Sequence, residues 1–179
     1  FYMKEHPAWV EAFNAAKPAD RYFKQAWRPV LDDGAYGRSL SDEQPWFVTK
    51  GGRLPMTMGA AQAQPDGAYY SALLRSPFVD EMSLEFARAA IKGEALGQDD
   101  APDILTVSLS GHDYVNHAFS AESRLSHDHL LHLDRLLQAF GDCGRGGVPA
   151  EGERSLERVA GASAAIALFY GAGLMWGRQ

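Results

Sequence analysis

The stretch Ile104-Leu105-Thr106-Val107-Ser108-Leu109-Ser110 runs directly into Gly111-His112-Asp113-Tyr114-Val115-Asn116-His117. The first part is β-branched and mostly apolar, which predicts an interior strand of a parallel sheet. In open α/β sheets, ligands bind beyond the carboxyl ends of the strands. The polar residues that follow this strand therefore lie where a functional site is expected.

Apolar residues at helical spacing flank the predicted strand on both sides. Before it, residues 76–97 predict a helix in which Asp80 or Ser83 is the expected N-cap and Gly93 the expected end. After it, residues from about 123 to 140 predict a second helix. The order helix, strand, loop, helix indicates a layered α/β fold. We expect these elements to form the ordered core, with the strand covered by a layer on each face.

The rest of the chain is less regular. Residues from Pro7 to about Phe23 predict a helix that is interrupted near Pro18. Residues 27–70 are rich in proline and glycine, and they predict long surface excursions over a core that is built elsewhere. From residue 141 onward the sequence turns to Gly, Arg and Glu with little periodicity, so we expect weak packing there.

Composition excludes several classes of function. The 179 residues include 17 Lys and Arg against 23 Asp and Glu. The formal charge of −6 disfavours electrostatic binding of nucleic acid over a broad surface. The single cysteine, Cys143, excludes an internal disulfide and a cysteine-rich zinc site. Residues 159–177 carry no formal charge and are long enough to span a bilayer. They are rich in Gly and Ala, however, so a buried tail is favoured over a membrane anchor.

Asp113 and His117 are the candidate metal ligands. Their spacing of four lets a carboxylate and an imidazole converge if the segment makes one helical turn. That pair suits zinc, and also manganese or iron. An Asp and a His four apart also occur by chance, and the alternative is a capping Asp and a surface His.

A wider set of residues resembles the alkaline phosphatase superfamily, in particular the PafA-like alkaline phosphatases and the type I phosphodiesterase/nucleotide pyrophosphatase group. The metal-binding segment of that family is similar to the segment 108–119 of this sequence. The likeness spans about residues 1–140 in order, and residues 30–70 match only loosely. It extends over Pro7-Ala8-Trp9-Val10, Phe86-Ala87-Arg88-Ala89-Ala90-Ile91, Asp128 and Leu133-Asp134-Arg135.

The resemblance implies a specific fold and chemistry. It implies part of a three-layer α/β/α sandwich with a mostly parallel central sheet, and two zinc ions in the active site. By that match, Asp113 and His117 supply two of the three protein ligands of one zinc. The implied parent protein is a periplasmic or secreted hydrolase of small-molecule phosphate monoesters. Within the same fold, the alternative is a phosphodiesterase or nucleotide pyrophosphatase.

The sequence also departs from the family. The nucleophilic Ser or Thr, one zinc-binding Asp and a Lys-x-Arg pair are expected upstream of Phe1, and the chain holds no histidine after His132. We therefore expect no catalytic nucleophile here, and only part of the site. We divide the chain into a partial domain, 1–140, and a non-matching tail, 141–179. The alternative interpretation is that the chain is a truncated or degenerate, non-catalytic fragment that acts at most as a binding or structural module.

Other polar and aromatic residues are assigned structural roles. The histidines of the second helix are expected at its surface or half-buried, and the alternative is that His129 and His132, three apart on one side of the helix, bind metal. His112 is expected either to support a ligand or to be solvated. The large aromatics of the first half are expected in the core rather than in a substrate cleft. These residues are His127, His129 and His132, and Trp9, Trp27, Tyr69 and Tyr70.

Overall fold

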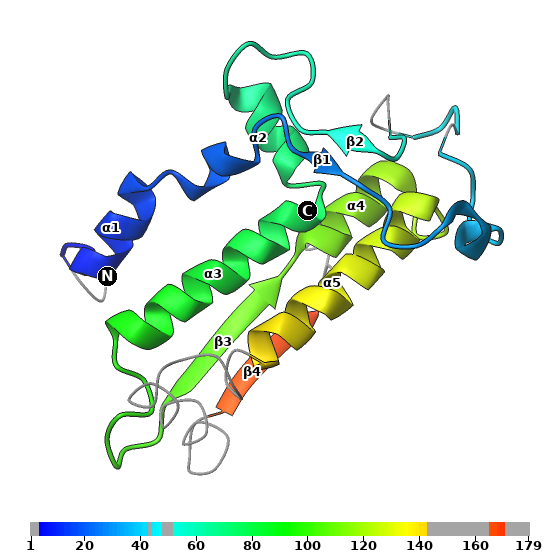
Figure 1. Ribbon diagram of the computed structural model, residues 1–179. Helices are drawn as coiled ribbons and strands as arrows, with labels where there is room; N and C mark the ends of the chain where they lie inside the picture. The colour runs from blue at the N-terminus through cyan, green and yellow to red at the C-terminus, as the bar shows by residue number, and fades with distance from the viewer. Residues whose placement is uncertain (1–3, 43, 48–51, 143–164, 171–179) are drawn as a thin grey trace, which may run out of the picture.

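A computed structural model describes residues 4–42, 44–47, 52–142 and 165–170 of the protein (Figure 1). Its α-helices are α1 (Ala8–Ala15), α2 (Gly67–Leu73), α3 (Pro77–Gly93), α4 (Gly111–Phe119) and α5 (Arg124–Asp142). Two 3-10 helices are η1 (Pro18–Tyr22) and η2 (Asp33–Tyr36). The strands are β1 (Ala26–Trp27), β2 (Met56–Thr57), β3 (Ile104–Leu109) and β4 (Ala165–Tyr170).

The core that the sequence predicts is formed by α3, β3 and α5. Figure 1 shows α3 and α5 side by side along β3. Leu84 of α3, Val107 and Leu109 of β3 and Leu133 of α5 are all buried in one cluster. Burial of each such side chain stabilises the fold by roughly 1.5–3 kcal/mol. The fold is α/β, as expected, and the two helices and the strand begin and end within a few residues of the predicted positions.

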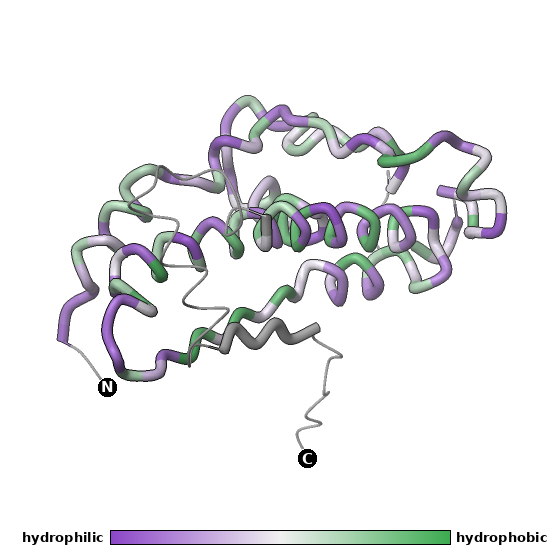
Figure 2. The backbone as a smooth tube through the Cα atoms, turned by 60° about the horizontal axis from the view of Figure 1, so that its bottom comes forward, coloured by the Kyte–Doolittle hydropathy of each residue, from purple (hydrophilic) through white to green (hydrophobic). Residues whose placement is uncertain are grey.

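The two faces of β3 differ in their surroundings. Val107 and Leu109 point into the α3–α5 layer, whereas Ile104, Thr106 and Ser108 are exposed. Figure 2 colours β3 mostly as hydrophobic and the connector before it as hydrophilic. The expectation that both faces of this strand are covered was wrong for the described residues. Two of the three exposed side chains carry hydroxyl groups, which explains why water is tolerated there.

A second parallel strand pairs with β3. Ile104 lies opposite Ala165 and Leu109 opposite Tyr170, in continuous register. This segment belongs to the non-matching tail, for which the sequence predicts no strand. Of the uncharged stretch 159–177, only β4 falls within the described residues. No helix in the described part of the chain is long and apolar enough to cross a membrane.

The first half of the chain covers the ends of α4 and α5. The short strands β1 and β2 pair antiparallel, Trp27 opposite Met56. Trp27 is fully buried and packs in a second cluster with Val115 and Phe119 of α4 and Leu125 of α5. The segment predicted as surface excursions therefore contributes core residues, and it lies over the helix that carries the candidate ligands.

The predicted helix of residues 7–23 is divided into α1 and η1. Lys17 adopts a left-handed conformation, with φ 47°, and η1 then begins at Pro18. Proline at the start of a helix is tolerated because its missing N–H has no intrahelical partner there. The interruption expected at Pro18 is therefore confirmed. The α1 helix packs on α3, where the Trp9 and Phe86 ring centroids lie 5.2 Å apart.

Candidate functional site

Both candidate ligands lie within one regular helix, α4, which begins directly after β3. One face of α4 is apolar: Val115, Ala118 and Phe119 are buried against Trp27 and Leu125. These residues recur at the helical spacing of three and four, which places them on one stripe. The opposite side of the helix carries the polar residues and faces solvent. The polar face of α4 therefore lies at the carboxyl end of β3 and is accessible to solvent.

Asp113 and His117 approach each other on that face. Asp113 lies in the first turn of α4 and His117 in the last. The distance between Asp113 Oδ1 and His117 Nε2 is 3.5 Å, and the two side chains are 33% and 67% exposed. Residues four apart are neighbours on a helix surface, which accounts for the approach. The expected convergence is confirmed, while metal binding by this pair stays a prediction.

The α4 helix is attached to α5 by polar as well as apolar contacts. Ser126 Oγ donates a hydrogen bond to Asn116 Oδ1 at 2.6 Å. Asn116 precedes His117, so this bond fixes the last turn of α4 from the side opposite the solvent. A metal ligand needs a held orientation, and such supporting bonds supply it.

Three titratable side chains are buried beneath the first turn of α4. Asp80 of α3 is 1% exposed, His129 of α5 is fully buried and His112 is 6% exposed. Burial raises the pKa of Asp80 to about 6, opposed by the hydrogen bond from Gly111. Burial lowers the pKa of His129 to about 3, aided by the neighbouring imidazoles of His112 and His132. Burial also lowers the pKa of His112. At neutral pH, Asp80 is therefore charged and His129 is neutral.

A second buried carboxylate, Asp128 of α5, holds the segment around β1 and η2. Asp128 accepts hydrogen bonds from Trp27 Nε1 at 2.6 Å, from the Val30 N–H at 2.7 Å and from the Tyr36 hydroxyl at 2.5 Å. Burial opposes its ionisation, but these bonds and His132 outweigh that effect and lower the pKa of Asp128. Its role in the described structure is to fasten the first half of the chain to α5.

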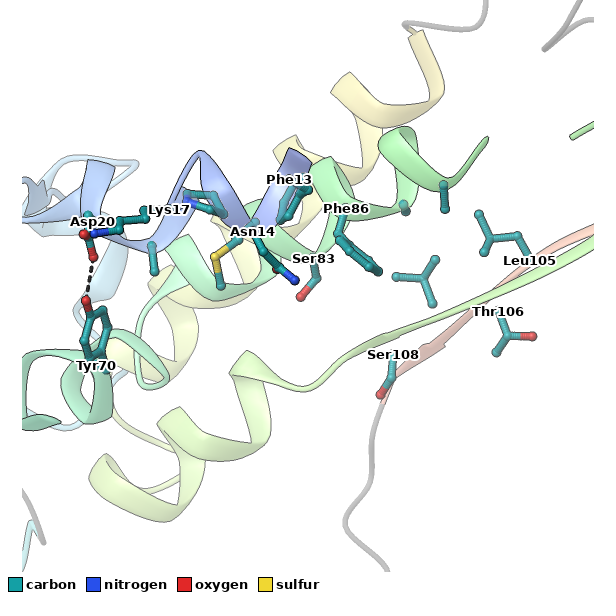
Figure 3. Close-up of a pocket in the computed structure, with 16 residues that line it drawn as sticks. Phe13, Asn14, Lys17, Asp20, Tyr70, Ser83, Phe86, Leu105, Thr106 and Ser108 are labelled. Atoms are coloured by element: carbon teal, nitrogen blue, oxygen red, sulfur yellow. Dashed lines mark hydrogen bonds between the residues drawn. The ribbon is translucent and has the colours of Figure 1, made fainter. Parts of the chain in front are cut away.

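A large cavity lies elsewhere in the molecule. Its volume is about 740 Å³, and it is bounded by α1, η1, α3 and β3 (Figure 3). Phe13, Phe86 and Leu105 line it, and the Tyr70 hydroxyl donates a hydrogen bond to Asp20 at its edge, at 2.6 Å. Neither Asp113 nor His117 contributes to the cavity. It is therefore separate from the candidate metal ligands.

The described residues do not complete a metal site. They contain no group of three or more His, Cys, Asp or Glu side chains that could hold a metal ion. His129 is fully buried against Asp80, so its assignment to the surface or to a half-buried position was wrong. His132 is partly exposed and contacts Asp128 and the Arg28 carbonyl, as a structural residue would.

The local sequence pattern does not reveal the role of Asp80. The pattern predicts Asp80 or Ser83 as the N-cap of α3, but the helix begins at Pro77 after Ser76, and Asp80 lies within the first turn. Ser83 Oγ instead donates to the Val79 carbonyl at 2.9 Å. An acidic residue among apolar neighbours on a buried helix face was the available signal, because such residues are rarely buried without a partner.

Comparison with known proteins identifies homologues. The chain is 37% identical over 139 residues to alkaline phosphatase PhoV of Synechococcus elongatus, covering 78% of this chain and 25% of that protein. It is 34% identical over 143 residues to a protein named calcium-transporting ATPase of Myroides odoratus, covering 78% and 26%. No protein-family model matches.

A solved structure matches as well. The crystal structure of wild-type alkaline phosphatase PafA superimposes with a TM-score of 0.69 at 33% identity, covering 79% of this chain and 27% of that one. The fold is thus a fragment of an alkaline phosphatase-like α/β fold. The chain is homologous to the alkaline phosphatases PhoV and PafA, and it spans about a quarter of the length of the relatives it matches.

Proposed function

We propose that the protein to which this chain corresponds hydrolyses phosphate monoesters of small molecules, and that Asp113 and His117 bind one zinc ion of its active site. One observation carries the proposal. In a chain homologous to alkaline phosphatases, a carboxylate oxygen and an imidazole nitrogen lie 3.5 Å apart on an exposed helix face at the carboxyl end of a parallel strand.

The donor set is chemically suited to zinc. A carboxylate oxygen and a neutral imidazole nitrogen are ordinary zinc ligands, and Asp113 and His117 are both accessible to solvent. Two ligands do not complete a tetrahedral site, so further ligands have to come from outside the described residues. A zinc ion bound there would supply Lewis-acid stabilisation of a leaving oxygen or a water nucleophile. We propose the same setting as for the family, a periplasmic or secreted enzyme.

The residues of this chain have a positioning task in the reaction. Asp113 and His117 would present their donor atoms from one rigid helix rather than from a loop. The buried stripe of α4 and the Ser126–Asn116 hydrogen bond keep that helix fixed on α5. Rigid presentation lowers the cost of organising the transition state, because little ordering remains to be done when the substrate binds.

Zinc titration of the 179-residue chain tests the assignment. The imidazole resonances of His117 are followed by NMR during addition of zinc sulfate, in the wild type and in Asp113→Ala. We expect a weak, saturable shift of His117 that is lost in the variant. The matched controls are Asp134→Ala, an exposed carboxylate of α5, and His6→Ala, an exposed histidine near the start. Equal binding by wild type and Asp113→Ala would refute the assignment.

A non-catalytic role is the second candidate. The two proposals differ in the zinc titration, because a structural module has no reason to bind zinc at this pair. Saturable binding that requires both side chains favours the hydrolase.

A further inference from the structure

The first turn of α4 is capped by a residue from another helix. Ser110 precedes the helix, and within the described part of the chain its side chain makes no capping hydrogen bond to α4. Ser110 Oγ lies instead 3.0 Å from Ser108 Oγ. The N–H of Gly111, the first residue of α4, donates to Asp80 Oδ1 at 3.0 Å. Asp80 therefore takes the role that an N-cap side chain normally has.

The Asp80 carboxylate is suited to this position by charge and burial. The N-terminus of a helix carries a partial positive charge, which favours a nearby anion. Asp80 is buried, so the interaction is little screened by water. A charge-assisted hydrogen bond of this kind is stronger than one between neutral groups.

The same carboxylate also faces α5. Asp80 Oδ2 lies 3.4 Å from His129 Nε2, and both side chains are buried. The His129 ring in turn lies 5.4 Å from the ring of His112, the second residue of α4. Asp80 thus lies where α3, α4 and α5 meet. From α3, its carboxylate contacts both α4, at Gly111, and α5, at His129.

Gly111 makes this close approach possible. A Cβ atom added to Gly111 would lie 2.5 Å from Asp80 Oδ2 and 2.7 Å from Val79 Cγ1. Real Cβ atoms do not approach other atoms so closely, so any larger residue would push α4 away from α3. The glycine directly before His112 and Asp113 is therefore explained by the proximity of Asp80 and not by backbone conformation.

We propose that Asp80 is a positioning residue that sets where α4 begins and thereby aligns Asp113 and His117 as a pair of metal ligands. The inference rests on the proposed function in one respect, that the pair binds metal. Asp113 lies two residues after Gly111, so a shift of the helix start moves its carboxylate directly. The last turn of α4, with His117, is held separately through the Ser126 bond to Asn116, so unwinding of the first turn moves Asp113 away from His117.

The test compares four variants of the full 179-residue chain. Asp80→Asn keeps an oxygen acceptor for the Gly111 N–H, whereas Asp80→Leu has nearly the same shape and no acceptor. Gly111→Ala displaces the carboxylate from the other side. Leu84→Ala serves as the control, because it destabilises the core between α3, β3 and α5, a cluster that contains no residue of α4. Zinc affinity is measured by the His117 NMR titration, and hydrogen exchange of the α4 amides is measured in parallel.

We expect zinc affinity to fall about tenfold in Asp80→Leu and Gly111→Ala, because loss of a residue that supports a metal ligand typically has an effect of this size. In Asp80→Asn, zinc affinity should stay within about twofold of the wild-type value. Exchange of the first-turn amides should rise in the first two variants more than in Leu84→Ala. Equal exchange in Asp80→Leu and Leu84→Ala would overturn the positioning role. A different outcome is that the wild type does not bind zinc, while hydrogen exchange of the α4 amides still rises in Asp80→Leu. That outcome would overturn the proposed function, but it would support the role of Asp80 in capping α4.

Discussion

Trp27 donates its indole N–H to Asp128 at 2.6 Å, although 101 positions separate the two residues in the sequence. Both side chains are fully buried. The bond joins β1 to α5 and brings the irregular first half of the chain over α5 and over α4, the helix that carries the candidate ligands. Without it, little in the local sequence would fix the path of residues 26–36.

Replacing Asp128 with alanine is expected to destabilise the protein by about 3 kcal/mol or more. The substitution leaves three donors without their acceptor, those of Trp27, Val30 and Tyr36, and each unsatisfied buried donor costs about 1–3 kcal/mol. The measurement is urea denaturation followed by circular dichroism. Asp134→Ala on the same helix is exposed, and it should change the free energy of unfolding by less than about 0.5 kcal/mol. Equal effects of the two substitutions would contradict the prediction.

Asp80 and His129 are expected to have opposite effects on the pH dependence of stability. The pKa of Asp80 in the folded state, about 6, exceeds its ordinary 3.8, so the folded state holds the extra proton and stability falls as pH rises between those values. The pKa of His129, about 3, lies below its ordinary 6.5, so the unfolded state holds the extra proton. Stability therefore rises with pH through that window, and the two effects oppose each other between about pH 4 and 6.

Single substitutions should expose each effect. Asp80→Asn removes the effect that lowers stability as pH rises. The free energy of unfolding of this variant should therefore rise with pH more steeply than that of the wild type, by up to roughly 1.4 kcal/mol per pH unit. His129→Gln should show the opposite change of slope. The neighbouring His112, His132 and Asp128 remain in all three proteins. Urea denaturation at pH 4.5, 5.5 and 6.5 measures the slopes, and parallel curves for the three proteins would refute the pKa assignments.

The 179-residue chain alone is expected to hydrolyse 4-nitrophenyl phosphate no faster than background. Asp113 and His117 are two ligands, and a two-metal phosphoryl-transfer site needs more than a pair. Release of 4-nitrophenol with and without added zinc is the measurement. Hydrolysis that is sensitive to chelators and lost in Asp113→Ala would contradict the prediction. In that case, the relative rate on bis(4-nitrophenyl) phosphate would decide between a monoesterase and a diesterase.

The elements that the sequence predicts well are those with a local signal. The strand β3 and the helix α5 follow from β-branched content and from apolar residues at helical spacing, and both occur close to the predicted positions. The convergence of Asp113 and His117 follows from the same local geometry once α4 is a helix. Each of these features depends on residues within a few positions of one another.

Features that depend on distant residues could not be predicted in the same way. Asp80 was assigned to cap its own helix, because the pattern of a cap is local, whereas its true partner, Gly111, lies 31 positions later. The strand β4 lies in a short apolar run, and such runs do not distinguish strand from helix without the partner strand. His129 is polar in sequence, yet it is buried in the structure, where it lies against Asp80, a residue 49 positions earlier in the chain.

The docking of α1 on α3 is expected to depend on Gly93. A Cβ atom at this position would lie 2.3 Å from Cγ of Trp9, whose ring packs against Phe86 and whose indole N–H donates to Glu94 at 2.5 Å. Gly93→Ala should therefore detach α1. The lost contacts of α1, a helix with no buried residue, should lower the free energy of unfolding by about 1.4 kcal/mol, and the higher helix propensity of alanine should offset up to about 1 kcal/mol of that loss.

The detachment of α1 can be measured directly. Hydrogen exchange of the amides in residues 8–15 should accelerate at least about tenfold in Gly93→Ala, because opening then costs over about 1.4 kcal/mol less, while the exchange of α3 and α5 stays as in the wild type. Gly141→Ala is the matched control, since Gly141 also lies near the end of a helix and has open space around it. If the two variants exchange alike in α1, the Trp9 contact is not what holds this helix to α3.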